Sequence, residues 1–328
     1  HRVDRRQRQM CIRDRDRRAI MKKIKVNLFD SLAPPHYYEE WGYHNFSSQF
    51  EPTKIEWIRE GQGLGMPEFD GVTVFTDKDI TSSWVDKVET KHKIAWLVEC
   101  RTIHPMEYKQ LLLVEDKFDY IFTFDEELLK RGPKYVKNLV GTSRVSNKDA
   151  GIHKKTKLLS LIASTKKWAH GHKLRHIVAE AIKNKYPVDL WGTAYKPFGK
   201  EDSDRSADAI KEGKTEPLKD YFFSITIMNA KHNNYFTETL IDVFRHGTIP
   251  IFWGCDNIGE YFNEKGMLIF NSPSELLNIL DNLSEQIYYD RLEYVKENYE
   301  LAKKYVSMDD TFSTNLTSLL SETELDIE

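Results

Sequence analysis

The residues best suited to chemistry lie in the run SITIMNAKHNNYFTETLIDVFRHGTIPIFWG, residues 224–254. The pattern predicts a strand, a polar loop, a helix over Phe236–His246 and a second buried strand. Thr237 or a neighbour is expected to cap the helix, because a hydroxyl can accept a hydrogen bond from an unpaired N–H. Gly247 stands where a left-handed C-terminal cap belongs. This order aims the positive end of a helix dipole at the polar loop, which suits a phosphate group.

Glu238 is expected in the first turn of that helix. A carboxylate at this place can accept hydrogen bonds from the hydroxyls of a sugar or a ribose. Alternatively, it only stabilises the first turn through the helix dipole. The spacing alone leaves both interpretations open.

The same segment resembles the donor-binding core of glycosyltransferase family 10, the α-1,3-fucosyltransferases. That family's signature is approximately N-x(5)-Y-V/I-T-E-K, followed by a helix and a short strand containing I/V-P-I/V-x-x-G. Here Asn229 precedes Tyr235-Phe236-Thr237-Glu238-Thr239 with the same spacing, and the strand reads IPIFWG. The resemblance implies that Asn229, Tyr235 and Glu238 contact a nucleotide sugar, with Thr237 and Thr239 in the same donor site.

One departure from the family pattern concerns the donor phosphates. The lysine that follows the glutamate in the family is Thr239 here. A hydroxyl brings no charge, and charge-assisted hydrogen bonds are about twice as strong as neutral ones. Three explanations stay open: another cation such as Lys231 or Arg245 covers the diphosphate, the donor differs from GDP-fucose, or catalysis is weak.

A second stretch that resembles the family is LLSLIASTKKWAHGHKLR, Leu158–Arg175, which predicts a strand, a loop and the start of a helix. In the family an arginine at the corresponding helix start holds the diphosphate, so the resemblance assigns this role to Arg175. An arginine fork can contact two phosphate oxygens without a metal. The alternative is a solvated arginine on a helix face.

The third stretch is IAWLVECRTIHP, Ile94–Pro105, in which a buried strand is expected to end at Glu99. The family has a glutamate in a similar place as general base. The resemblance therefore implies that Glu99 takes the proton from an acceptor hydroxyl in an inverting transfer. The alternative is a strand-end carboxylate that pairs with Arg101 or a lysine.

The elements that must position these residues alternate between short apolar runs and amphipathic stretches, which predicts parallel sheets covered on both faces. The expected strands are Lys25–Phe29, Thr73–Thr76, Ile94–Glu99, Tyr120–Phe124, Leu158–Ala163, Val188–Trp191, Ser224–Met228, Ile249–Trp253 and Met267–Phe270. The expected helices are Met106–Phe118, Leu174–Lys185, Phe236–His246, Ser274–Leu283 and Tyr289–Tyr305.

The chain is longer than one hydrophobic core normally serves, and the polar run Gly141–Lys157 is predicted to link two domains. We expect an α/β protein of the GT-B-like class, with two Rossmann-like domains facing a cleft and a helical C-terminal tail that packs back across both. The expected division is a non-native or disordered leader (1–20), an N-terminal acceptor-side α/β domain (21–150), a C-terminal nucleotide-sugar donor domain (151–275) and the helical tail (276–328).

Composition narrows the function classes. The chain has 328 residues and a net charge of −3, and its first twenty residues hold eight Arg and three Asp. Residues 21–328 therefore carry −3 − 5 = −8, which does not suggest a nucleic-acid partner. Three cysteines are too few for a disulfide framework or a zinc site. The Asp202–Asp204 pair reads as a solvated loop, so no metal site is expected.

The expected activity is a metal-independent, inverting transfer of fucose from GDP-fucose, as substrate and not cofactor, to a hydroxyl of a glycan acceptor. The alternatives are a transferase for another nucleotide sugar, an exostosin-like transferase, and a catalytically degenerate scaffold that binds glycans or nucleotides. The aromatic cluster Tyr37–Phe46 either lines an acceptor groove or packs in the core. The absence of an 18-residue apolar run favours a bacterial cytoplasmic location, with peripheral association at the inner face of the membrane as a variant.

Overall fold

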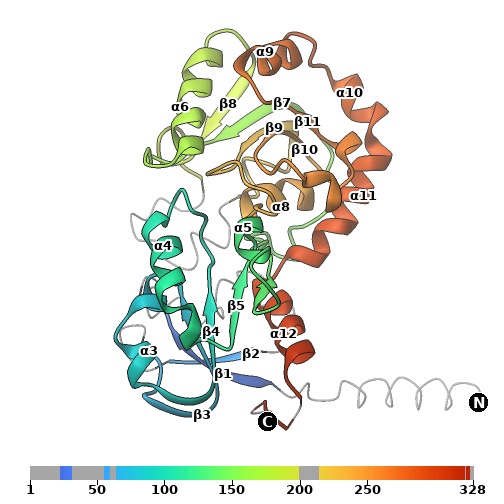
Figure 1. The fold of residues 1–328 in the computed structure, drawn as a ribbon. Coiled ribbons are helices and arrows are strands. Elements are labelled where there is room, and N and C mark those ends of the chain that lie inside the picture. Colours follow the sequence, from blue (N-terminus) through green and yellow to red (C-terminus); the bar gives the residue numbers. More distant parts are fainter. Residues whose placement is uncertain (1–22, 32–54, 60–63, 199–213, 322, 326–328) are drawn as a thin grey trace, which may run out of the picture.

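The fold is given by a computed structural model, which describes residues 23–31, 55–59, 64–198, 214–321 and 323–325. Two parallel sheets, one above the other in Figure 1, form the centres of two α/β domains. The leader 1–20, the aromatic cluster 37–46 and the Asp202–Asp204 pair lie outside the described residues.

The first sheet has six strands in the order β2-β1-β3-β4-β5-β6. Every neighbouring pair in it is parallel. This is the order of a doubly wound sheet, in which ligands bind at the carboxyl ends of the strands where the order reverses. Its strands are β1 Ile24–Phe29, β2 Ile55–Ile58, β3 Glu68–Thr76, β4 Glu89–Trp96, β5 Tyr120–Thr123 and β6 Tyr135–Lys137.

The second sheet has five parallel strands in the order β11-β10-β9-β7-β8. Read from β7 onward this is again the doubly wound order, and its reversal lies between β7 and β9. Its strands are β7 Lys157–Ile162, β8 Val188–Trp191, β9 Tyr221–Ile227, β10 Ile249–Trp253 and β11 Leu268–Ile269.

Helices cover both faces of each sheet, because strand residues point alternately to opposite sides. The first domain contains α3 Trp84–Lys87, α4 Pro105–Val114 and α5 Glu126–Leu129, with 3-10 turns η1 Asp77–Thr81 and η2 Glu115–Lys117. The second contains α6 His170–Ile182, α8 Glu238–Arg245, α9 Pro273–Asp281, α10 Glu285–Asp290 and α11 Leu292–Ala302, with η3 Ile258–Glu260, η4 Glu264–Gly266 and η5 Lys303–Tyr305.

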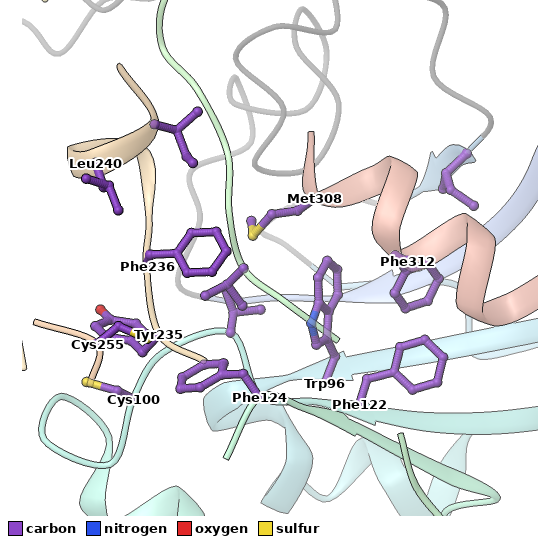
Figure 2. Close-up of a cluster of buried hydrophobic side chains, with 14 of the residues drawn as sticks. Trp96, Cys100, Phe122, Phe124, Tyr235, Phe236, Leu240, Cys255, Met308 and Phe312 are labelled. Carbon is purple, nitrogen blue, oxygen red and sulfur yellow. The ribbon is translucent and has the colours of Figure 1, made fainter. Parts of the chain in front are cut away.

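The last helix, α12 Met308–Leu319, returns from the second domain to the first (Figure 1). Its Phe312 is fully buried, and the ring centroid lies 4.8 Å from that of Trp96 and 5.0 Å from that of Phe122. Figure 2 shows these rings in the same cluster as Tyr235 and Phe236 of the second domain. One continuous apolar core therefore joins α12, the first sheet and the segment before α8, as the sequence predicted for a tail that packs across both halves.

All nine strands predicted from the sequence are present, with ends that differ by a few residues. The short strands β2 and β6 were missed, and α6 begins at His170, earlier than the predicted Leu174. The run Gly141–Lys157, whose polar sequence predicted a loose linker, is partly buried in the structure. Ser143 within it is fully buried, and its hydroxyl donates a 2.8 Å hydrogen bond to Asp242 of α8. The domain limits drawn from the sequence stay a prediction.

Candidate active site

The segment between β9 and β10 folds as its sequence predicts. Thr237 is the N-cap of α8, and its hydroxyl accepts a hydrogen bond from the backbone N–H of Thr239 at 3.4 Å. Gly247, just beyond the helix, has a φ of 59°. An L side chain is strained in this left-handed conformation, which explains the glycine. The N-terminus of α8 is thereby fixed beside the polar loop that follows β9.

Arg175 lies in the second turn of α6 and reaches the end of β9. Its Nε donates to the carbonyl oxygen of Ile227 at 2.8 Å, and its Nη2 donates to the same carbonyl and to Oδ1 of Asn229 at 3.0 Å. Gly171 permits this approach, since a Cβ there would lie 1.7 Å from the carbonyl oxygen of Met228. The structure therefore brings Arg175 and Asn229 together at the point where the strand order of the second sheet reverses.

Glu238 is the first residue of α8, and two cations lie beside it. One of its carboxylate oxygens is 3.4 Å from Lys214 Nζ and 3.7 Å from Arg144 Nη2. Burial opposes ionisation of this carboxyl, but the charges of Lys214 and Arg144 outweigh burial and hold its pKa well below the usual 4.5. Glu238 is thus an ionised hydrogen-bond acceptor whose side chain keeps 20% of its surface exposed.

Lys214 also pairs with Asp242, one turn further along α8, at 3.1 Å. The sequence did not indicate Lys214 or Arg144 as partners of this helix. Both lie far from it along the chain, so only the fold brings the four charges together. A single sequence does not indicate that this lysine and this arginine lie beside the two acidic residues in the fold.

Glu99 follows β4 by three residues, at the carboxyl edge of the first sheet. Arg101 does not pair with it, because the Arg101 guanidinium donates to both oxygens of Asp125 at 2.5 and 2.7 Å. Burial raises the pKa of Glu99, and the charge of Glu238 in the other domain raises it further, while His104 and Lys166 lower it. Glu99 therefore lies within electrostatic reach of Glu238 and of Lys166, across the two domains.

Tyr235 lies in the core between the domains. Its side chain is fully buried, and its ring stacks on Phe124 of the first domain at a centroid distance of 5.1 Å. Figure 2 shows it beside Cys100 and Cys255. Burial raises the pKa of its hydroxyl well above 10, and the charge of Glu99 adds to this effect. Direct contact between Tyr235 and a nucleotide sugar stays a prediction.

The neighbouring Asn234 holds the same segment to the first domain. Its Nδ2 donates to the carbonyl oxygen of Phe124 at 3.0 Å, and its Oδ1 accepts from Asn257 Nδ2 at 2.9 Å. At the edge of this contact, the Thr102 hydroxyl lies 3.2 Å from the His232 ring. The loop before α8 is therefore anchored to both domains.

The two cations that the sequence offered in place of the family lysine have other partners. Lys231 pairs with Asp256 at 2.7 Å and donates to Asn271 at 2.8 Å. Arg245 is buried in the last turn of α8, away from its N-terminus, and donates to Asn147. Thr239 is partly exposed at the start of the helix. Among the described residues, the cations that pair with Glu238 are Lys214 and Arg144.

The loop between β7 and α6 contributes residues that sequence reasoning missed. Trp168 in this loop is 64% exposed, with Lys166 Nζ 5.1 Å from its ring centroid and the His172 ring edge-on at 5.4 Å. Burial lowers the pKa of His172 to about 4, and the charges of Arg175 and Lys166 lower it further. Figure 1 places this loop opposite the turn that precedes α4, where Glu99 lies. The available signal was a tryptophan directly after two lysines, in a loop that follows a predicted strand.

In the part of the chain that the structure describes, no three His, Cys, Asp or Glu side chains are grouped so that they could hold a metal ion. No helix among the described residues is both long enough and apolar enough to cross a membrane.

Comparisons with known proteins show the family and the fold of the chain. The family model "Glycosyltransferase family 10 (fucosyltransferase) C-term" matches residues 152–324. An alpha-(1,3)-fucosyltransferase, FucT of Helicobacter pylori, is 30% identical over 96 residues, which are 29% of this chain and 18% of that protein.

Among solved structures, an alpha1,3-fucosyltransferase with GDP superposes with a TM-score of 0.55 at 16% identity, over 92% of this chain and 91% of that one. The same type of enzyme with GDP-fucose gives a TM-score of 0.50 at 16% identity, over 87% and 90% of the two chains. The two Rossmann-like sheets and this likeness show the GT-B fold that the sequence predicted.

Proposed function

Because the chain belongs to glycosyltransferase family 10 (fucosyltransferase), we propose that it transfers fucose from GDP-fucose to a glycan hydroxyl with inversion. The observation that carries the proposal is the contact between Arg175 and Asn229 at the switch point of the second sheet, with Glu238 within electrostatic reach of Arg175. The H. pylori relative is an alpha-(1,3)-fucosyltransferase, and one similar structure holds GDP-fucose.

The donor site is proposed to form around the ends of β9 and α8. Arg175 is held rigidly by Ile227 and Asn229, so its guanidinium is preorganised for the negative charge of a diphosphate. The first turn of α8 adds the positive end of the helix dipole. Glu238, kept ionised by Lys214 and Arg144, accepts hydrogen bonds from hydroxyls of the donor.

In the proposed reaction, Glu99 accepts the proton of the acceptor hydroxyl as its oxygen bonds to the anomeric carbon of the donor sugar. The bond between that carbon and the phosphate oxygen breaks, and the electron pair leaves with GDP. The negative charge that develops on the leaving diphosphate is stabilised by Arg175. The raised pKa of Glu99 suits this role, because a stronger base accepts the proton more readily.

The acceptor is proposed to approach along the loop between β7 and α6. Trp168 offers an exposed apolar face there, and Lys166 of the same loop lies within electrostatic reach of Glu99. An aromatic face combines apolar contact with a defined geometry, which suits the flat side of a sugar ring. This assignment concerns a glycan acceptor as a class and names no linkage.

A ligand-dependent stability experiment tests the donor assignment. The purified chain is heated with GDP, UDP, dTDP, CMP and the matching sugar nucleotides. At about 100 times the dissociation constant, a bound ligand adds about 2.7 kcal/mol of stability, which raises the midpoint by several degrees. We expect this shift with GDP and GDP-fucose only.

The variant Glu238→Ala should lose the shift with GDP-fucose, whereas the exposed Glu216→Ala should keep it. A shift with a different nucleotide would replace fucose by another donor sugar and keep the transferase. No shift with any of these ligands would favour a scaffold without a nucleotide site. An unchanged shift in Glu238→Ala would contradict the role of this carboxylate.

A further inference from the structure

Asp77, which no sequence pattern singled out, occupies a strained position next to the proposed base. It follows β3 directly and has a φ of 38°. Asp77 and Asn234 are the two non-glycine residues with positive φ among those the structure describes. Such a conformation costs free energy and persists only where surrounding contacts enforce it. The side chain of Asp77 is almost fully buried, with 5% of its surface exposed.

The contacts of Asp77 converge on the backbone of Glu99. Strands β3 and β4 pair as far as Thr76 and Trp96, where regular pairing between them ends. The next N–H groups along β4 find other acceptors: Oδ1 of Asp77 accepts from Val98 N at 3.0 Å and from Glu99 N at 3.2 Å. The carboxyl side chain thus continues the hydrogen bonding of the sheet beyond the end of the strand.

The other side of Glu99 is fixed from α4. The hydroxyl of Tyr108, a residue with 2% of its surface exposed, donates to the carbonyl oxygen of Glu99 at 2.9 Å. Both peptide groups that flank Glu99 are therefore held by buried side chains. Glu99 is thus restrained on both sides although it lies outside regular secondary structure.

We propose that Asp77 is a positioning residue for the general base: it fixes the backbone of Glu99 and so directs its carboxylate toward the acceptor hydroxyl. The inference rests on the proposed function, in which Glu99 is the base. A displacement of a reacting group by about 1 Å can slow catalysis by about 100-fold, so such restraint has a kinetic consequence.

The residue type follows from two requirements at one position. The left-handed backbone accepts Gly, Asn and Asp more readily than other residues. The two N–H groups of Val98 and Glu99 need a side-chain oxygen as acceptor, which glycine lacks. Burial raises the pKa of Asp77 well above its usual range, and the charges of Glu99 and Asp30 add to this, while the two N–H groups lower it. Asparagine keeps a side-chain oxygen acceptor at this position and also tolerates the left-handed backbone.

The test compares Asp77→Asn with Asp77→Gly in the full chain, by the release of GDP from GDP-fucose. Asp77→Gly fits the backbone without strain but removes the acceptor, so we expect kcat to fall about 100-fold with an unchanged KM for GDP-fucose. Asp77→Asn keeps the acceptor oxygen and should stay within about threefold of the wild-type kcat, because the hydrogen bonds from Val98 and Glu99 are retained. Wild-type kcat in Asp77→Gly, or an equal loss in both variants, would overturn the proposal.

The variant Glu99→Gln separates a failure of the proposed function from a failure of this inference. Glu99→Gln should release GDP at least about 100 times more slowly than wild type. If it does not, or if the wild type itself is inactive, the proposed function fails and the inference fails with it. If Glu99→Gln is inactive while Asp77→Gly is normal, the inference alone is overturned.

If Asp77→Gly does not fold, Tyr108→Phe tests the same restraint from the carbonyl side. It removes one hydroxyl and keeps the ring, and we expect about a tenfold loss of kcat at constant KM. A wild-type kcat in Tyr108→Phe would then count against the restraint of Glu99 as a kinetic device.

Discussion

His246 is predicted to make the stability of the protein depend on pH. It caps the C-terminal end of α8 and is fully buried. Neither ring nitrogen has a hydrogen-bond partner within the part of the chain that the structure describes. The His153 ring lies 5.4 Å away, and the Lys155 ammonium donates to the His246 carbonyl oxygen at 2.7 Å. Burial lowers the pKa of His246 well below 6.5, and the charges of His153, Lys155, Arg245 and Lys219 lower it further.

The size of this pH effect follows from the different protonation of His246 in the folded and unfolded states. In the unfolded chain this imidazole takes up a proton as the pH falls through 6.5, whereas in the folded protein it stays neutral. His246 therefore leaves the free energy of unfolding unchanged above pH 6.5 and lowers it below that pH. Below pH 6.5, each further pH unit lowers the free energy of unfolding by about 1.4 kcal/mol. At pH 5 the loss relative to pH 7.5 amounts to about 2 kcal/mol.

The assay is urea unfolding of the wild type and of His246→Leu at pH 7.5, 6.5 and 5.0. Leucine has a similar volume and no titrating group, so the variant should be spared the loss of about 2 kcal/mol. His170→Leu is the matched control, because the exposed His170 ring is in contact with water in both states. A difference between wild type and His246→Leu that stays constant within about 0.5 kcal/mol over this pH range would refute the reasoning.

Two other predictions concern the tail and the base. Phe312→Ala should lower the free energy of unfolding by about 3–5 kcal/mol in urea denaturation, since the ring packs on Trp57, Trp96 and Phe122. The control Ser318→Ala, at an exposed position of the same helix, should change the free energy of unfolding by less than about 0.5 kcal/mol. The pH profile of kcat for GDP-fucose should show an acidic limb above pH 4.5, because burial and the charge of Glu238 raise the pKa of Glu99 and only its ionised form accepts a proton. An inflection at or below pH 4.5 would contradict that assignment.

Local chemistry made the donor-side helix predictable. The cap at Thr237, the first-turn position of Glu238 and the left-handed Gly247 all depend on residues within one short segment. The long apolar strands were equally visible, because each is a continuous apolar run. Strands β2 and β6 were missed, and their length alone does not explain this, because the equally short edge strands β8 and β11 were predicted.

The features that the sequence could not supply depend on contacts between distant residues. The pairing of Lys214 with Glu238, and the hydrogen bonds that Asp77 accepts from the backbone N–H groups of Val98 and Glu99, join segments about 20 residues apart or more. The core position of Tyr235 requires Phe124 of the other domain. A single sequence gives the side chains, but which of them are in contact depends on how the two sheets pack together.

The place of α12 has a consequence for the order in which the chain folds as it is made. The helix that covers one face of the first sheet begins about 170 residues after that sheet's last strand ends at Lys137. At about 5–20 residues per second, the ribosome needs roughly 10–35 s to make the intervening chain. During that interval the face around Trp96 and Phe122 stays uncovered by its helix. The first domain to be synthesised is thus the last to be completed, and an apolar face that stays uncovered for this time is prone to aggregation until α12 packs on it.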